Sequence, residues 1–232
     1  MAQRPAYIPQ LDSQYLVKTE MIEFKYHSGF ALVQKQKSID ELHKAIHEAF
    51  GFDKILEVSS KSRDELGVAL SAFNLMITDK KTNEKYSVEC AFQSSKYFEN
   101  GWPYIDLLKA TSREAKKDER LKNSGRLLGF KFRSIEWDLT PLTAFYDWLY
   151  VNALNQNPQL HDELLQYQAF TDIEFNPKKS VNCQAYSIAM FVALAKKDLL
   201  DRIKYPNEFL EFYKEYQADN TSKHHTDNLK LL

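Results

Sequence analysis

Residues 142–154, LTAFYDWLYVNAL, restrict more than any other segment how this chain can fold. As a helix they would be apolar around nearly the whole circumference, and such a helix is stable only where other elements bury it. Thr140 and Pro141 come just before, and a capping hydroxyl followed by proline favours a helix start. The fold must therefore enclose this helix, and 232 residues suffice for one large domain or two small ones.

Composition points to a globular protein without an overall charge signal. Hydrophobic residues make up 44% of the chain, there are only 6 glycines, and the formal net charge is −1. Positive charge is concentrated locally, because residues 109–133 hold nine Lys and Arg residues against three acids. This excess either holds a phosphate backbone or forms a solvated helix face.

Membrane, metal and cofactor chemistry find little support in the sequence. No apolar leader and no run of ~18 apolar residues is present, so we expect a cytoplasmic protein that does not enter membranes. Cys90 and Cys183 lie too far apart for a metal-type pair and suggest reduced thiols. His43 and His47 have a zinc-compatible spacing, but Lys44 stands where a metalloprotease needs Glu. We predict no metal, and the lack of glycine-rich phosphate loops predicts no cofactor.

The patterns along the chain predict an α+β fold that is mostly helical. Residues 1–12 suggest an extended arm, 16–27 a strand, and 38–50 a helix capped by Ser38. Further elements are expected later: a strand within 53–60, a hairpin turning at 80–83, largely helical structure from residue 89, a helix over 180–197 and a frayed polar tail over 218–232.

Residues 84–100, EKYSVECAFQSSKYFEN, change from strand-like alternation to a helical pattern at Glu89. In a helix Glu89, Gln93 and Lys96 would share one face, next to large apolar side chains. This polar face either meets a ligand or begins with a carboxylate that the helix dipole stabilises. The spacing alone leaves both interpretations open.

Four blocks, in order, resemble one protein family. They are KSRDELGVALSAFNL (61–75), YSVECAFQSSKYF (86–98), SREAKKDERL (112–121) with EWDLTPLTAFYDWL (136–149), and NPQLHDELLQYQAFTDIEFNP (157–177) with SVNCQAYSIAMFV (180–192). Together they are similar to the NADAR proteins, also called YbiA-like, which act as N-glycosidases. FALVQKQKSIDELH (30–43) further resembles the branch associated with DarT-type DNA ADP-ribosyltransferase toxins, in which the NADAR protein is the antitoxin.

This resemblance implies a YbiA/NADAR-like domain with a small antiparallel sheet. Residues 1–54 would be an N-terminal extension packed on it, 55–200 the catalytic domain, and 201–232 a helix and polar tail. It also implies an activity, the removal of ADP-ribose from guanine bases of single-stranded DNA, which would neutralise a DarT-like toxin. Two alternatives stay open: a protein that binds ADP-ribose or the toxin without hydrolysis, and an N-glycosidase acting on a small nucleotide metabolite.

The implied reaction assigns roles to two residues. Cleaving an N-glycoside develops positive charge on the ribose, and the carboxylate of Glu89 would stabilise it or act as a general base. Lys61 matches a loop lysine of the family, and a lysine with a lowered pKa can capture an opened ribose as a Schiff base. The simpler interpretation of Lys61 is a solvated or phosphate-binding side chain.

The remaining candidate residues would bind ADP-ribose. They are Ser71, Phe73, Asn74, Gln93, Lys96, Trp137, Asn182 and Gln184. Trp137 has a core packing alternative, and Asn182 a helix-cap alternative. Asp147 lies inside the apolar helix, where we expect it to be paired structurally rather than to act as a second carboxylate. Ala72 and Cys90 depart from the usual Asn and His of the family blocks, which suggests altered recognition.

Overall fold

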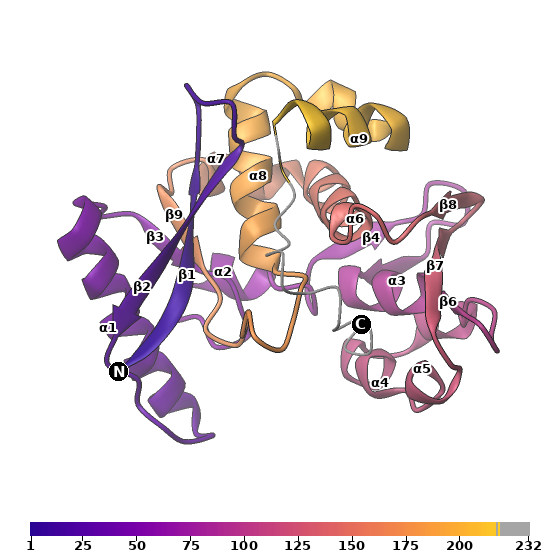
Figure 1. Ribbon diagram of the computed structural model, residues 1–232, viewed down its shortest axis with the longest axis horizontal. Helices are drawn as coiled ribbons and strands as arrows, with labels where there is room; N and C mark the ends of the chain where they lie inside the picture. Colours follow the sequence, from indigo (N-terminus) through magenta and orange to yellow (C-terminus); the bar gives the residue numbers. More distant parts are fainter. Residues whose placement is uncertain (217, 219–232) are drawn as a thin grey trace.

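The computed structural model describes residues 1–216 and residue 218, and the α+β expectation is confirmed. Figure 1 shows two groups of strands on either side of a helical centre. The larger sheet has the order β2-β1-β9-β3 and the smaller one the order β6-β7-β8, and β4 and β5 form a hairpin. The expected polar tail over 218–232 lies outside the described residues, apart from Ala218.

The strands and helices have the following bounds. The strands are β1 Ala2–Pro9, β2 Val17–Phe24, β3 Ile55–Glu57, β4 Met76–Thr78, β5 Lys85–Ser87, β6 Lys96–Phe98, β7 Leu127–Phe132, β8 Ile135–Trp137 and β9 Ala169–Thr171. The α-helices are α1 Leu32–Phe50, α2 Glu65–Ala69, α3 Val88–Ser95, α4 Ser112–Lys117, α5 Arg120–Asn123, α6 Ala144–Asn155, α7 His161–Leu164, α8 Gln184–Lys196 and α9 Pro206–Glu215. Short 3-10 turns occupy Ile105–Lys109, Pro158–Leu160 and Leu200–Lys204.

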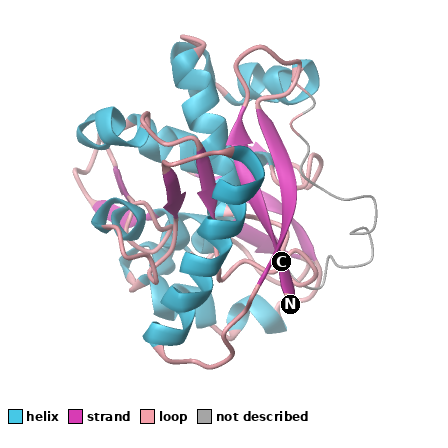
Figure 2. Cartoon of the chain, turned by 90° about the vertical axis from the view of Figure 1, so that its left-hand side faces the viewer, coloured by secondary structure: helices cyan, strands magenta, loops and turns pink. Residues whose placement is uncertain are grey.

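Two helices cover opposite faces of the larger sheet. Strand side chains alternate between faces, so Ala6 and Ile8 of β1 pack with α1 while Tyr7 joins the main core with α8. Figure 2 shows α1 lying across the outer face of the strands. α8 in turn contacts α6, and α6 contacts α3. The two apolar helices, α6 and α8, are buried between the sheets, as the pattern of residues 142–154 predicts for α6.

Several boundaries differ from the sequence expectations. The predicted N-terminal arm is β1, a strand paired with both β2 and β9. The first helix begins at Leu32, and Ser38 lies buried inside it, donating to the carbonyl of Gln34. A three-stranded antiparallel sheet, β6 to β8, stands where mostly helical structure was expected. No helix within the described residues has the length and apolarity to cross a membrane.

The predicted boundary between residues 54 and 55 falls inside a continuous sheet. β1 pairs antiparallel with β9, and β9 pairs parallel with β3. The larger sheet is therefore mixed rather than purely antiparallel, and the first 54 residues supply two of its four strands. The division into an extension and a catalytic domain stays a prediction.

Candidate active site

The carboxyl ends of two neighbouring parallel strands bring acidic side chains together. β3 ends at Glu57, and β9 ends at Thr171, which Asp172 follows directly. Ligands commonly bind beyond this edge of parallel strands, because the loops that follow them gather there. Both carboxyls are almost completely buried, with exposed fractions of 2% for Glu57 and 7% for Asp172.

α2 packs directly against the end of β3. A Cβ added at Gly67 would lie 2.1 Å from the carbonyl oxygen of Glu57 and 2.5 Å from Ser62 Oγ. Only glycine permits this approach. α2 is capped by Asp64, whose carboxylate accepts from the backbone N–H of Leu66 at 2.8 Å. The block GVALSAFN is thereby held over the strand ends.

Gln184, at the start of α8, joins three segments through its side-chain amide. Its Nε2 donates to the carbonyl of Val58 at 2.6 Å and to Asp172 Oδ2 at 2.9 Å, and its Oε1 accepts from the backbone N–H of Ala72 at 2.8 Å. The predicted ligand-binding role of Gln184 stays a prediction. Its observed bonds make it a residue that positions the segments around it.

Ala72 connects this assembly to Glu89. The backbone N–H of Glu89 donates to the carbonyl of Ala72 at 2.9 Å. Ser87 caps α3 by accepting from the backbone N–H of Cys90 at 3.1 Å, so Glu89 falls in the first helical turn. Residues of all four sequence blocks are thus linked. The bonds of Gln184 and Ala72 join the first, second and fourth blocks. Ser112 Oγ joins the third block by donating to the carbonyl of Phe73 at 2.8 Å.

The carboxylate of Glu89 is buried and has an amide partner. Only 5% of Glu89 is exposed, and Gln93 Nε2 donates to its Oε1 at 2.8 Å. α3 ends at Ser95, so Lys96 lies on β6 rather than on the helix with Glu89. Lys96 is nevertheless 4% exposed and within electrostatic reach of Glu89. The three residues of the predicted polar face therefore stay together.

Burial lowers the pKa of the Lys96 side chain. Loss of hydration, opposed by the Glu89 carboxylate and aided by nearby Lys116, lowers the pKa of Lys96 to about 8. Its Nζ lies over the ring of Phe92, 4.9 Å from the ring centre. Lys96 is therefore a lysine with a lowered pKa near Glu89, and the covalent role of Lys61 stays a prediction.

Burial also raises the pKa of the two carboxyls at the strand ends. For Glu57 loss of hydration is the largest cause and the charge of Asp172 adds to it, which raises its pKa to about 8. For Asp172 loss of hydration raises the pKa to about 6 against several hydrogen bonds that favour the ionised form. Within the described residues neither carboxyl forms a salt bridge with Lys or Arg.

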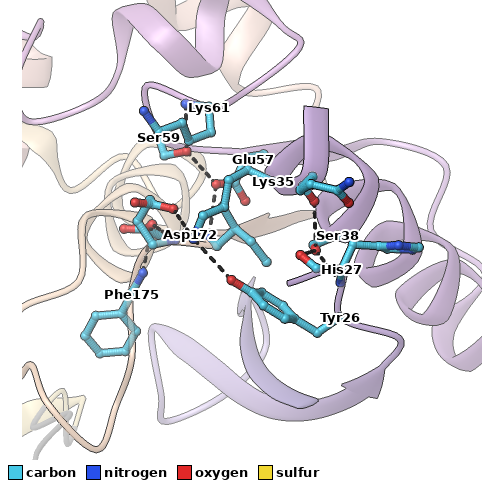
Figure 3. A network of polar contacts seen from close by, with 12 residues as sticks. Tyr26, His27, Lys35, Ser38, Glu57, Ser59, Lys61, Asp172 and Phe175 are labelled. Carbon is cyan, nitrogen blue, oxygen red and sulfur yellow. Dashed lines mark hydrogen bonds and ion pairs between the residues drawn. The ribbon is translucent and has the colours of Figure 1, made fainter. Parts of the chain in front are cut away.

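Figure 3 shows the polar contacts around Glu57, which reach the loop of Lys61 through Ser59. A further chain of contacts joins Glu57 to α1. His43 Nε2 lies 3.0 Å from Thr171 Oγ1, and Thr171 Oγ1 lies 2.7 Å from Glu57 Oε2. On the other side Ser59 Oγ donates to Glu57 Oε1 at 2.7 Å and accepts from the backbone N–H of Lys61 at 3.1 Å. Glu57 therefore fixes the loop that carries Lys61.

Four predicted binding residues have a buried side-chain atom without a hydrogen-bond partner in the described part of the chain. These atoms are Ser71 Oγ, Gln93 Oε1, Trp137 Nε1 and Asn182 Oδ1. Ser71 precedes Ala72, Gln93 holds Glu89, and Asn182 stands two residues before Gln184. Buried polar atoms are almost always paired, so such atoms call for an explanation, and a ligand supplies one.

Other predicted residues have different surroundings. Asn74 Nδ2 donates to the carbonyl of Val68 at 2.8 Å and lines an open cleft of about 590 Å³ between α2 and Asn157. Phe73 lies under Lys116, whose Nζ is 5.2 Å from the ring centre. Trp137 packs among core aromatics, 5.1 Å from the Trp148 ring, which favours its core alternative.

Asp147 has the structural pairing that the sequence led us to expect. Its carboxylate accepts from Ser187 Oγ and from the hydroxyl of Tyr213, and only 1% of it is exposed. Cys90, which replaces the usual His, donates to the carbonyl of Ala110 at 3.2 Å. Asp147 therefore connects α6 with α8 and α9, and Cys90 connects α3 with the segment before α4.

The sequence analysis missed Glu57, Asp172 and Tyr146 as parts of this site. Glu57 and Asp172 each end a short apolar run, ILE and AFTD, and an acid in such a place was the available signal. Tyr146 was hidden in the apolar helix; loss of hydration is the main cause that raises the pKa of its phenol, and the charges of Glu89 and Asp172 add to it. Among the described residues no cluster of three His, Cys, Asp or Glu side chains is placed to hold a metal ion.

Comparison with known proteins shows which family the chain belongs to. No curated protein matches the chain. The family model described as DarT1-associated NADAR antitoxin matches residues 2–223. This match covers nearly the whole chain, including the N-terminal strands and α1. The chain therefore belongs to the family of DarT1-associated NADAR antitoxins.

Proposed function

We propose that this antitoxin is an N-glycosidase that removes ADP-ribose from guanine bases of single-stranded DNA and so reverses the action of a DarT-like toxin. The observation that carries the proposal is that three of the unpaired buried atoms are Ser71 Oγ, Gln93 Oε1 and Asn182 Oδ1. They lie on the three segments that Ala72 and Gln184 join beside Glu89. An unpaired buried polar atom costs about 1–3 kcal/mol, and the hydroxyl-rich ADP-ribose would remove that cost on binding.

Glu89 is the residue we assign to the reacting centre. The C1′–N bond breaks with positive charge developing on the ribose, which a nearby carboxylate stabilises. Gln93 holds one oxygen of Glu89 and fixes its orientation. Burial strengthens the effect, because charges interact more strongly where water is excluded.

Positive charge near Glu89 suits the diphosphate of the substrate. Lys96 is buried beside Glu89, and Lys116 lies close enough to influence it. Asn182, which lies just before α8, would bind a phosphate oxygen as well. Lys61, held on its loop by Ser59, keeps its proposed role as the lysine that captures an opened ribose.

The test incubates the protein with a single-stranded oligonucleotide ADP-ribosylated on guanine and follows loss of the adduct by mass. Glu89→Gln should bind ADP-ribose but lower the release rate by about 10²–10⁴. Glu119→Gln, which changes an exposed glutamate, is the matched control and should retain full activity.

Each rival function predicts a different result. A protein that only binds would leave the adduct intact, and its Glu89→Gln variant would still protect cells from the toxin. An enzyme for small metabolites would cleave ADP-ribosylated guanosine nucleotides but not the oligonucleotide.

A further inference from the structure

Trp102 is a large aromatic side chain that the fold leaves in solvent. It is 80% exposed, whereas the other two tryptophans, Trp137 and Trp148, are 4% and 7% exposed. Ile105, three residues further on, is 68% exposed. Single exposed apolar residues are common on protein surfaces, so the loop and the charges around Trp102 decide whether it marks a binding site.

The loop that carries Trp102 is fixed on its N-terminal side by backbone hydrogen bonds. Phe98 and Gly101 exchange two such bonds, at 2.8 and 3.2 Å. The N–H of Asn100 donates to the carbonyl of Ser124, just after α5, at 3.0 Å. The backbone that leads to Trp102 is therefore anchored to the end of α5.

The residues that follow Trp102 are fixed as well. Pro103 restricts the backbone of the residue before it. The hydroxyl of Tyr104 bonds Ser124 Oγ, and the guanidinium of Arg120 lies over the Tyr104 ring, 4.4 Å from its centre. The fold thus presents the indole of Trp102 on a rigid loop, and a ligand that binds to it pays little for ordering the protein.

The surroundings of this loop are positively charged. Lys122 on α5 and Arg126 just after it are exposed, and neither forms a salt bridge within the described part of the chain. Two exposed acids, Glu99 and Asp106, belong to the same region, and Asp106 is already paired in a salt bridge. Together with the basic residues of α4, this surface is complementary to a phosphate backbone.

Both ends of the loop are connected to the candidate active site. β6 begins at Lys96, which is buried near Glu89 and lies six residues before Trp102, a span of at most about 22 Å. After the loop, the 3-10 turn Ile105–Lys109 contacts α3, the helix that carries Glu89. Figure 1 shows α4, α5 and β6 around α3 at this end of the molecule. A few nucleotides of an extended strand therefore suffice to reach from Glu89 to Trp102.

We propose that Trp102 stacks on an unmodified base of single-stranded DNA, a few nucleotides away from the ADP-ribosylated guanine at Glu89. This inference rests on the proposed glycosidase function and assigns a second subsite to its substrate. Aromatic side chains on a basic surface are the means by which proteins hold single strands, and every base offers a π face. The subsite accepts any sequence but selects single strands, because the bases of a duplex are already stacked on one another.

The experiment measures binding of an unmodified single-stranded oligonucleotide, which needs no catalysis. Trp102→Ala should raise Kd by about 5- to 100-fold. Trp102→Phe should retain most of the affinity, whereas Trp102→Leu, which is apolar but cannot stack, should lose as much as Trp102→Ala. The dependence of affinity on salt should keep its wild-type slope in all three variants, because stacking releases no counterions. Tyr205→Ala, at a tyrosine that is 64% exposed, is the control and should bind like wild type.

Tryptophan fluorescence reports on the same contact directly. Trp137 and Trp148 are buried, so a stacked base should quench mainly the emission of Trp102. Adding the oligonucleotide should therefore quench wild type, and this change should be lost in Trp102→Phe although that variant still binds. The duplex of the same sequence should cause much less quenching.

Activity links the subsite to the reaction. Trp102→Ala should raise KM for the ADP-ribosylated oligonucleotide and leave KM for ADP-ribosylated guanosine as in wild type, because the latter has no second base. Equal Kd values and equal quenching for wild type and variants would overturn the inference while the glycosidase function stands. If Trp102→Ala instead weakened binding of a purified DarT-like toxin and left DNA affinity unchanged, Trp102 would belong to a protein interface, which also overturns it. If wild type releases ADP-ribose from no substrate, the proposed function fails, and the binding and fluorescence measurements still decide whether Trp102 holds a strand.

Discussion

The side-chain amide of Gln184 donates to the Asp172 carboxylate over 2.9 Å, and this bond ties the first turn of α8 to the loop after β9. The same amide bonds Val58 and Ala72, so three polar groups of the site depend on one side chain. A single residue thus sets the spacing between the two strand ends and the helix that carries Glu89.

Gln184→Ala should therefore destabilise the protein and weaken the site together. It removes the amide from all three partners and leaves them unpaired, so we expect a loss of about 2–4 kcal/mol in the free energy of unfolding. ADP-ribose binding should fall in parallel. Urea denaturation and calorimetric titration measure the two effects. Gln159→Ala, at an exposed glutamine, should change stability by less than about 0.5 kcal/mol.

The Glu57→Gln variant should gain stability, measured as the free energy of unfolding, relative to wild type as the pH rises. Burial raises the pKa of Glu57 from its ordinary 4.5 to about 8, so the folded protein holds a proton that the unfolded chain has lost. Wild-type stability must then decrease between pH 4.5 and 8, and an amide has no such proton to lose. The difference in unfolding free energy should shift by at least about 2 kcal/mol over this range. Glu65→Gln, at an exposed position, should show a flat difference, and a flat difference for Glu57→Gln would contradict the argument.

Lys96→Met tests a pH dependence of stability with the opposite sign. Burial lowers the pKa of Lys96 to about 8 from 10.5, so the charged form is disfavoured in the folded protein. Between these pH values the unfolded chain binds more protons, and wild-type stability should rise with pH relative to the methionine variant, by about 3 kcal/mol. Chemical denaturation from pH 7 to 10.5 measures the difference. Exposed Lys117→Met should show none of this rise.

Gly67→Ala should be among the most damaging small substitutions. The new methyl group would meet the Glu57 carbonyl oxygen at 2.1 Å, and this oxygen belongs to a strand that cannot move freely. Overpacking of this kind costs typically 1–3 kcal/mol. Thermal denaturation of Gly67→Ala and Gly67→Ser should show lowered midpoints for both, and a wild-type midpoint would mean that α2 can shift away from β3.

The sequence predicted the buried centre of this fold better than its edges. The apolar residues of α6 surround nearly its whole circumference, so the burial of this helix could be predicted from its residue pattern alone. Pro5 and Pro9 predicted an extended arm over residues 1–12 and did not indicate that it pairs as a strand. Pairing with β2 and β9 is a tertiary effect that local residue preferences do not contain.

In the candidate site, too, local sequence predicted some features and tertiary pairing created others. Glu89, Gln93 and Lys96 lie close in sequence, so their spacing was enough to group them. Glu57 and Asp172 are brought together by a parallel strand pair that closes across more than a hundred residues, and no local pattern reveals such a pairing. Ser38 shows the converse error, because a cap-type residue can also bond inside a helix, as it does to Gln34.

Only part of the basic segment 109–133 remains available to bind DNA. Lys109, Arg120, Lys131 and Arg133 form salt bridges with acidic neighbours. Arg113, Lys116 and Lys117 on α4 are exposed, and no salt bridge of theirs occurs among the described residues. α4 contacts α3, which carries Glu89, so its charges adjoin the candidate site.

Replacing Arg113 and Lys117 together by Gln should therefore weaken activity on oligonucleotides only. Lys116 is left unchanged, because it lies close to Lys96 and would act on the diphosphate. Each neutralised phosphate contributes about 0.7 to the slope of log affinity against log salt for a single strand, so two should reduce it by about 1.4. KM for the ADP-ribosylated oligonucleotide should rise, whereas KM for ADP-ribosylated guanosine should stay the same, because these two side chains are not part of the proposed ADP-ribose site. The matched control replaces the paired Lys109 and Lys131 by Gln and should change the slope much less. An equal change in both double variants would show that α4 has no special role in holding the strand.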